Sequence, residues 1–130
     1  IMYMDAKSPA ITSVGTAEVS MMLGERYQQT VFKGDVMGMP FEGISVVGYD
    51  NAKKVFVNSW IDNTGTGMMV LEGKWEKPGK VVVYIGKLYD PMKGKDLKVR
   101  QVLTLIDDQN QRMEMYTNED GKERKTMELK

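Results

Sequence analysis

The sequence contains no cysteine and no histidine among its 130 residues. The missing cysteines exclude disulfides, thiolate nucleophiles and cysteine-based metal sites. The missing histidines remove the commonest general base, the commonest zinc ligand and the usual proximal haem ligand. An enzyme built from this chain would have to work with Asp, Glu, Lys, Arg, Tyr, Ser or Thr. We therefore expect no metal site and no cofactor.

An excess of charge of either sign is also missing, because 18 basic residues balance 18 acidic ones. No bulk field would therefore recruit nucleic acid or an anionic membrane. The apolar stretches are a handful of residues long, far short of a membrane span. By its length, the chain is predicted to form a single domain over residues 1–130. No signal peptide is visible, and nothing in the sequence indicates a compartment.

Short runs separated by turn signals about every ten residues are typical of an all-β sandwich or barrel. We predict strands at residues 1–5, 11–22, 26–34, 41–50, 54–62, 66–77, 80–89, 97–107, 111–118 and 123–129. The segment "TAEVSMMLGERY" also fits a helical spacing, but its Val and Thr residues and the following Gly24 favour strand and turn. About ten short strands joined by short turns predict a single antiparallel up-and-down meander. We expect this meander to close into a barrel, because closure leaves no unpaired edge strands.

Three glycine-containing segments are predicted to be turns. Asp120-Gly121 suits a two-residue hairpin, and Pro78-Gly79 suits a tight turn in which the glycine takes a positive φ. Gly65-Thr66-Gly67 resembles part of a phosphate-binding loop, but such a loop needs glycines that open a helix. Here a predicted strand follows and position 70 is valine. We therefore interpret this segment as the corner between two strands.

The hairpin at 41–62 gathers most of the aromatic residues that point to a function. If "YDNAKK" is a tight turn that pairs Gly48 with Val55, then Gly43 lies opposite Trp60, whose indole would cover the glycine. This register sorts the side chains onto two faces. One face carries Ile44, Val46, Val55, Val57 and Ile61, and the other carries Phe41, Ser45, Val47, Tyr49, Phe56, Asn58, Trp60 and Asp62.

The second face suits the wall of a cavity that binds an amphipathic molecule. Trp60, Tyr49 and Phe56 would supply contact area, while Asn58 and Asp62 would orient a polar head group. Two alternatives stay open. Trp60 can be an ordinary core residue while Asp62 caps the turn that follows it. The aliphatic face can also point inward, which leaves the aromatic rings against a partner subunit.

Three segments of the chain carry a resemblance to a known family. They read "GMPFEGISVVGYDNAKKVFVNSWIDNTGTGMM", "YDPMKGKDLKVRQVLTLID" and "MEMYTNEDGKERKTMELK". Together they resemble DUF1579, a bacterial family known as a domain of unknown function, from about Gly15 to the end of the chain. The matching polar and aromatic positions are Arg26, Glu42, Tyr49, Trp60, Asp62, Arg100, Glu114, Tyr116 and Lys125.

The resemblance implies a lipocalin-like barrel of the calycin kind, which usually holds a small apolar or amphipathic molecule. It implies no established activity. Members of the family normally begin upstream, with a strand that bears a Gly-x-Trp-like signature. This chain lacks that part, so we expect the domain to lack its N-terminal first-strand segment.

A second candidate site combines Arg100, Glu114 and Tyr116 on consecutive predicted strands. An arginine inside a barrel could neutralise a ligand carboxylate, with a tyrosine hydroxyl beside it. A buried Arg–Glu pair that needs no ligand is the alternative. The "DDQN" turn allows more than one register. With a loop centred on Asp108-Gln109, Arg100 points away from the face that carries Leu103, Leu105, Glu114 and Tyr116.

The 12 methionines fit an adaptable pocket, a plain core or a dimer surface equally well. We predict a protein that binds a small apolar or amphipathic molecule inside the barrel, rather than an enzyme. One alternative is an isomerase or lyase in which Glu42, Asp62 or Glu114 acts as a base with a raised pKa. Another is a homodimeric interaction module without a ligand. No nucleic acid, membrane span or metal is expected.

Overall fold

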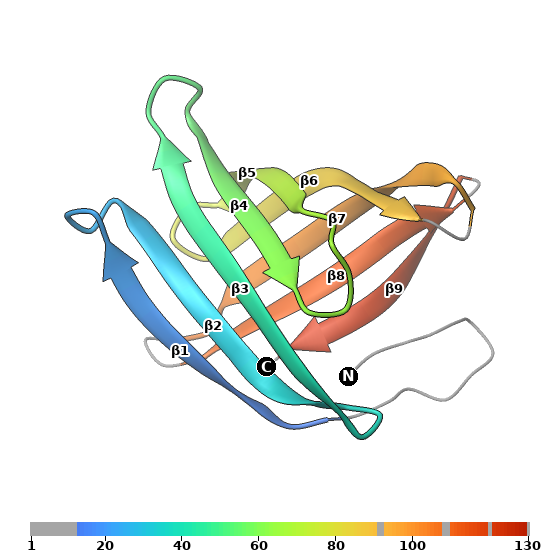
Figure 1. Ribbon diagram of the computed structural model, residues 1–130. Coiled ribbons are helices and arrows are strands. Elements are labelled where there is room, and N and C mark those ends of the chain that lie inside the picture. The colour runs from blue at the N-terminus through green and yellow to red at the C-terminus, as the bar shows by residue number, and fades with distance from the viewer. Residues whose placement is uncertain (1–12, 91–92, 108–109, 120, 130) are drawn as a thin grey trace. The chain divides into compact units, whose positions relative to one another are not determined.

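The computed structural model describes residues 13–90, 93–107, 110–119 and 121–129. Within these ranges every regular element is a strand (Figure 1). The strands are β1 (Gly15–Met22), β2 (Tyr27–Val36), β3 (Met39–Asp50), β4 (Val55–Asp62), β5 (Met69–Lys77), β6 (Val81–Asp90), β7 (Lys95–Leu105), β8 (Gln111–Glu119) and β9 (Lys122–Leu129). The strand predicted at 1–5 lies outside the described residues. The other nine are confirmed, and the segment with the helical spacing forms β1 and a turn.

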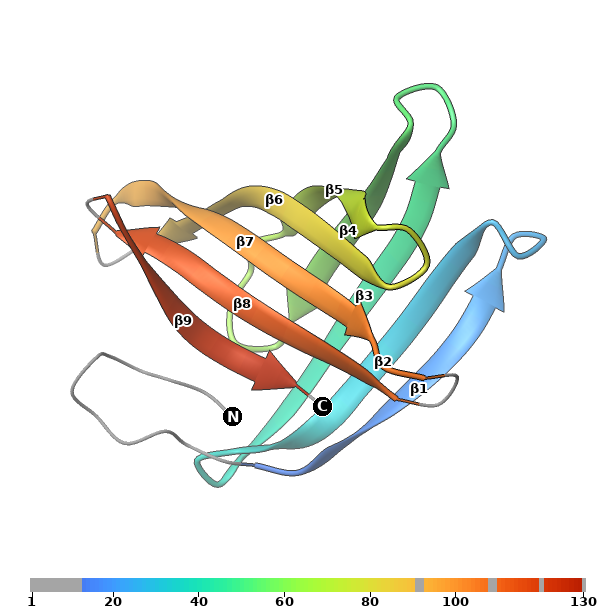
Figure 2. The same ribbon diagram turned by 180° about the vertical axis from the view of Figure 1, so that it is seen from behind.

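Each strand lies next to the one that follows it in the sequence, so the antiparallel meander is confirmed. The contacts divide the chain into two compact units, which are described separately. The N-terminal unit is Ser13–Glu72, and the C-terminal unit takes in the chain from Gly73 onward. Figure 2 shows β6 to β9 of the C-terminal unit side by side in sequence order.

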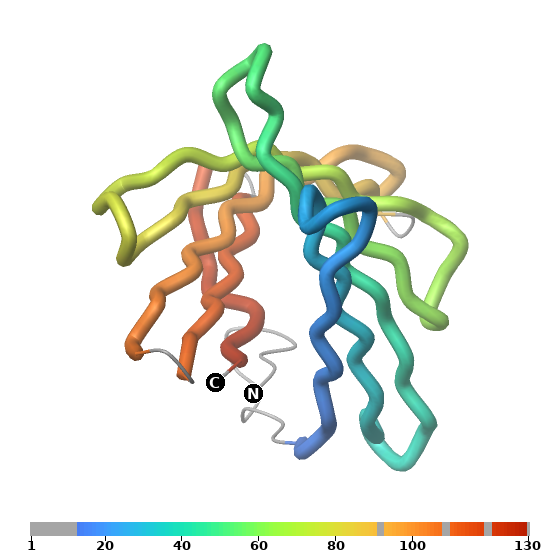
Figure 3. Tube along the Cα trace, turned by 90° about the vertical axis from the view of Figure 1, so that its left-hand side faces the viewer, coloured from blue at the N-terminus to red at the C-terminus, as the bar shows by residue number. Residues whose placement is uncertain are grey.

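The β3–β4 hairpin extends beyond the ends of β1 and β2, with its tip at residues 51–54 (Figure 3). Asp50 builds this tip. Its Oδ1 accepts the backbone N–H groups of Ala52 and Lys53, and its carbonyl accepts the N–H of Lys54 at 2.7 Å. Lys54 takes a positive φ of 58°. The loop between the strands therefore has four residues, from Asn51 to Lys54.

Because of this longer loop, the predicted register of the hairpin is wrong by two residues. Gly48 pairs with Val57 instead of Val55, and Gly43 lies opposite Asp62 instead of Trp60. The two faces survive the error, since side chains alternate along a strand with a period of two. The sorting of the hairpin into an aliphatic and an aromatic face is thus confirmed.

Three aromatic rings lie over glycines on neighbouring strands. Trp60 faces Ser45 and leans diagonally over Gly43, so the predicted cover of this glycine is confirmed although the direct pairing is not. Tyr27 lies over Gly48, where an added Cβ would approach its ring to 2.6 Å. In the C-terminal unit, the ring of Tyr84 covers Gly73 in the same way. At each of these positions only hydrogen leaves room for the ring.

The core of the C-terminal unit lies on one face of its strands. That face carries the buried residues Val82, Tyr84, Leu97, Val99, Gln101 and Thr117. The opposite face is charged and includes Lys87, Lys98, Arg100, Arg112 and Glu114. This division reflects the alternation along the first part of β7, where Leu97 and Val99 lie on the core face and Lys98 and Arg100 on the opposite face.

The β7–β8 register decides between the alternatives that the DDQN turn left open. Asp107 caps the loop, because its Oδ1 accepts the N–H of Asn110, while the carbonyl of Asn110 accepts the N–H groups of Ile106 and Asp107. Five residues therefore separate the strands. Arg100 pairs with Tyr116, so the register in which Arg100 points away from Tyr116 and Glu114 does not occur, and the three residues lie on one face. A shift of one residue moves every side chain of a strand to the other face.

The three predicted glycine-containing turns can be compared with the described residues. The turn at Pro78-Gly79 is closed by a hydrogen bond from Lys80 N to Lys77 O at 2.9 Å, and Gly79 has a φ of 74°. Gly121 also has a positive φ, of 82°, whereas Asp120 lies outside the described residues. The Gly-Thr-Gly segment leads into β5, a strand, so no helix N-terminus stands there to hold a phosphate.

Candidate functional site

The registers of β1 to β4 place nearly all charged side chains of these strands on one face. That face includes the aliphatic face of the β3–β4 hairpin and is called the charged face from here on. It carries Glu18, Lys33, Asp35, Glu42 and Asp50. The other face, called the aromatic face, carries Phe32, Phe41, Tyr49, Phe56 and Trp60, and its only charged side chain is Asp62. Such a division is typical of an antiparallel sheet whose face with few charges, here the aromatic face, is covered, while the charged face is in contact with solvent.

Trp60 is the centre of the aromatic face. Its ring centroid lies 5.4 Å from that of Phe32, edge to face at 61°, and 6.3 Å from that of Phe41, nearly stacked at 20°. These are favourable geometries for aromatic pairs. Gly43 lies beneath the indole. The three rings therefore form one half-buried cluster built from β2, β3 and β4.

Asp62 is held in place from two sides. Its Oδ2 accepts the indole N–H of Trp60 at 2.7 Å, and its Oδ1 accepts the backbone N–H of Thr64 at 2.9 Å and the Thr64 hydroxyl. Burial raises the pKa of Asp62, but the hydrogen bonds from Thr64 and Trp60 outweigh it and leave the pKa below its ordinary value. Asp62 is thus ionised at neutral pH. Its predicted role as a cap of the following turn is confirmed.

The remaining predicted residues of the N-terminal unit lie further along the same face. Ser45 donates its hydroxyl to Oδ1 of Asn58 at 3.3 Å, while no described residue accepts the amide N–H groups of Asn58. Tyr49 and Phe56 form an edge-to-face pair at 5.0 Å near the tip of the hairpin. The structure therefore brings all five of these predicted residues, Tyr49, Phe56, Asn58, Trp60 and Asp62, to one face.

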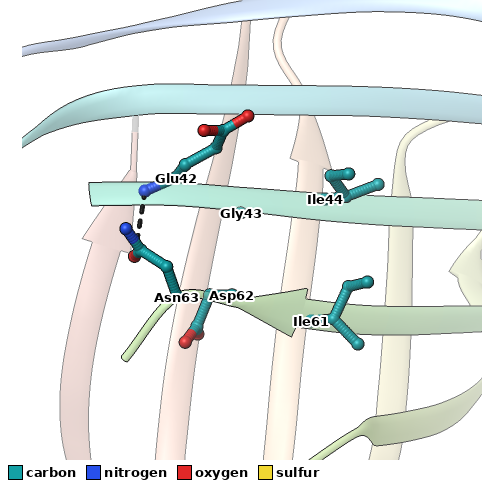
Figure 4. A pocket seen from close by; sticks show the side chains of 6 residues that line it. All are labelled: Glu42, Gly43, Ile44, Ile61, Asp62 and Asn63. Carbon is teal, nitrogen blue, oxygen red and sulfur yellow. Dashed lines mark hydrogen bonds between the residues drawn. The ribbon is translucent and has the colours of Figure 1, made fainter. Parts of the chain in front are cut away.

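A shallow hollow of about 190 Å³ opens at the end of β4 (Figure 4). It is lined by Ile44 and Ile61, which pair with each other, and by the ends of the strands around Glu42. Asn63 closes one side by accepting the backbone N–H of Glu42 at 3.1 Å. Pockets for drug-sized ligands have volumes of about 300–1,000 Å³. This hollow is too small and too open to hold such a ligand alone.

In the C-terminal unit, Arg100 and Tyr116 pair across β7 and β8, but both side chains already have partners. Arg100 forms a bidentate ion pair with Glu123, with distances of 3.0 and 2.6 Å, and its guanidinium lies 4.4 Å from the centre of the Tyr116 ring. The hydrogen bond with Glu123 raises the pKa of Arg100 and lowers that of Glu123. The pair is about 40% exposed and belongs to the charged side of the unit.

Glu114 lies in a second cluster beside this pair. It accepts hydrogen bonds from Lys125 at 2.9 Å and from the Tyr116 hydroxyl at 3.2 Å, and Arg112 approaches it to 3.4 Å. Lys125 also donates to Glu128 at 2.7 Å. The hydrogen bond from Lys125 is the largest of the effects that keep the pKa of Glu114 below its ordinary value. Glu114 is therefore a weaker base than a free glutamate.

Two partners in these clusters were missed from the sequence. Phe32 completes the aromatic cluster, and it could have been found from its place opposite Gly43 once the β2–β3 register was known. Glu123 neutralises Arg100, although the two residues are 23 positions apart. The Asp120-Gly121 signal in the sequence favours a hairpin between β8 and β9, but by itself it does not place Glu123 beside Arg100, which lies on β7.

The described residues contain no group of three or more acidic side chains arranged to hold a metal ion. The same residues contain no helix that is long and apolar enough to cross a membrane. Fold and faces together define an all-β meander protein with one charge-poor aromatic sheet face.

The family model described as "Protein of unknown function (DUF1579)" matches residues 2–130 of the chain. The chain therefore belongs to this family, and the resemblance noted in the sequence is confirmed. A search of curated proteins and a search of solved structures found no match.

Proposed function

We propose that the protein is a lipocalin-like barrel that binds a small apolar or amphipathic molecule along the aromatic face of β1 to β4. The observation that carries this proposal is the composition of that face. It combines five aromatic rings with a single charged side chain, Asp62, while five charged side chains lie on the reverse face. A closed barrel would turn such a face toward an interior cavity.

The exposure of apolar side chains on this face supports the proposal. Val19, Met21 and Tyr49 are 57%, 52% and 48% exposed, although all three lie on the aromatic face. Covering apolar surface is favourable by about 25 cal/mol per Å². A bound apolar molecule would therefore gain from covering these side chains and the rings beside them.

Polar groups on the same face would orient the ligand. Asn58 keeps its two amide N–H groups free of acceptors among the described residues, and it is half-buried two positions from Trp60. A donor in such a place suits a carbonyl or hydroxyl oxygen of the ligand. Tyr49, Phe56 and Trp60 would then supply the apolar contacts.

Arg100, Glu114 and Tyr116 form a weaker candidate for ligand binding. Arg100 would reach a ligand carboxylate only by giving up its bidentate contact with Glu123. The enzyme alternative is also weakened, because a carboxylate acting as a general base needs a raised pKa. The pKa values of Asp62 and Glu114 are both lowered.

The proposal is tested with the neutral fluorescent probe N-phenylnaphthylamine. We expect it to brighten on binding, and Trp60→Ala should weaken its affinity by about tenfold, since the indole contributes contact area worth about 1.4 kcal/mol. The matched control is Trp75→Ala, which removes the other tryptophan, on β5. This control should bind the probe as the unmodified protein does.

Two results would count against the proposal. Equal affinities of the Trp60 and Trp75 variants would place the probe elsewhere. Failure of the unmodified protein to bind any apolar probe, together with a loss of dimer on Trp60→Ala in sedimentation measurements, would favour the homodimeric module instead. Native mass spectrometry of protein from its own host would show directly whether a small molecule copurifies.

A further inference from the structure

The charge on the aromatic face indicates which head group the ligand carries, an inference that rests on the proposed function. Asp62 is the only charged side chain that β1 to β4 place on this face. No lysine or arginine of these strands lies there, and no described basic residue forms an ion pair with Asp62. The face therefore carries one uncompensated negative charge beside a cluster of aromatic rings.

The contacts of Asp62 fix its orientation but leave room for one more donor. A carboxylate has about four lone-pair sites. Three of them are used, two on Oδ1 by Thr64 and one on Oδ2 by the indole of Trp60. The second lone-pair site of Oδ2 is therefore unused, and Oδ2 is the oxygen that lies next to the Trp60 ring.

The aromatic rings add to the attraction for a cation. The face of an indole or phenyl ring attracts ammonium groups within about 6 Å of its centre. Trp60 carries Asp62 at its edge and packs against Phe32 and Phe41. A carboxylate in the same place would meet both a like charge and the negative faces of the rings, without a basic residue to balance it.

We propose that the aromatic face takes a cationic amphiphile, an organic amine with an apolar body, and that Asp62 receives its ammonium group. The apolar body would then lie along Trp60 toward Phe56 and Tyr49. Asn58, four positions before Asp62 on the same side of β4, would meet an oxygen of the ligand about 13 Å from the amine.

The test compares three probes with the same chain and different head groups: dodecylamine, dodecanol and dodecanoate, each below its aggregation limit. Binding is followed by the emission of Trp60 in a Trp75→Phe background. We expect dodecylamine to bind about three- to tenfold more tightly than dodecanol, as is typical of a partly exposed ion pair. Dodecanoate should bind more weakly than dodecanol.

Asp62→Asn should abolish the preference for the amine and leave the affinity for dodecanol unchanged within about twofold. Glu42→Gln is the matched control, because it removes a negative charge on the neighbouring strand from the reverse face of the sheet. This control should keep the preference. Salt provides a second measurement that needs no substitution, since raising the ionic strength should weaken the binding of the amine and not of the alcohol.

The outcomes separate this inference from the proposed function. Binding of all three probes at Trp60 with equal affinity, or a preference for dodecanoate, would overturn the inference and leave the ligand site standing. A preference for the amine that persists in Asp62→Asn would remove Asp62 from the role given to it. If none of the probes changes the emission of Trp60, the ligand site and the cationic head group fail together.

Discussion

Replacing Gly43 by alanine is predicted to destabilise the protein more than any ordinary glycine-to-alanine change in a strand. The new Cβ would lie well inside van der Waals contact with Cζ2 and Cη2 of Trp60. The backbone of β3 is fixed by β2 on one side and β4 on the other, so the indole has to move. Moving it disturbs the contacts with Phe32 and Phe41 and the hydrogen bond to Asp62.

The size of the effect follows from these contacts. Each aromatic pair is worth about 0.5–1.5 kcal/mol, and a hydrogen bond to a charged group about 1.5–3 kcal/mol. Because the side chains around Trp60 relax in part, we expect a total loss of about 2–4 kcal/mol in the free energy of unfolding. In urea this corresponds to a midpoint lower by about 1–2 M.

The measurement is urea unfolding followed by far-ultraviolet circular dichroism. Gly65→Ala is the matched control, since an added Cβ there meets no atom within 4 Å, and we expect a change below about 0.5 kcal/mol. In a Trp60→Leu background, Gly43→Ala should be far less harmful, with a coupling of about 1–3 kcal/mol. Equal midpoints for Gly43→Ala and Gly65→Ala would refute the reasoning.

Two further predictions concern titration. The pKa of Glu114 is lowered mainly by the hydrogen bond from Lys125, so this pair stabilises the fold above a pH of about 4.5 and the contribution is lost as the pH falls through the folded pKa. Lys125→Met should raise the pKa of Glu114 in a carboxyl NMR titration, whereas Lys122→Met should leave it unchanged. Burial raises the pKa of Tyr84 to about 12, so its contribution to stability begins to fall above a pH of about 10. The pKa of Tyr116 is raised as well, so an ultraviolet titration should show late tyrosines, of which the one lost in Tyr84→Phe is Tyr84. The same titration curve for the native protein and for Tyr84→Phe at high pH would contradict the burial argument.

The strands and the order of the meander follow from the sequence because turn residues and alternation are local signals. The residues of the aromatic face were also predicted correctly from the sequence, although the predicted register of the β3–β4 hairpin was wrong. An error of two residues at the 51–54 loop preserves the faces, whereas a change of one residue at the loop after Leu105, where the sequence left the register open, reverses them for Arg100. In both places an aspartate, Asp50 or Asp107, caps a loop longer than the shortest turn.

The partners of Arg100 and Glu114 were beyond the reach of such reasoning for a different reason. Glu123 and Lys125 lie on β9 between the turn and the bulge beside Met115 and Tyr116, so the bulge does not set their pairing with β8. Arg100 lies on β7 and reaches Glu123 across β8. This ion pair therefore follows from the sequence only when the β7–β8 and β8–β9 registers are both known.

The glycines beneath the aromatic rings also bear on how the chain reaches its fold. A hairpin that forms two residues out of register keeps its apolar and polar faces, so burial alone hardly distinguishes it from the native one. The rings do distinguish it. After such a slip of β4 along β3, the indole of Trp60 would rest on the Cβ of Phe41 or Ser45 instead of on Gly43. A slip of β2 along β3 by two residues would likewise place Tyr27 opposite Val46 or Asp50 instead of Gly48. The glycines beneath the rings thus favour the native register during folding. In a slipped hairpin each ring would collide with a side chain, so the strands would separate and pair again.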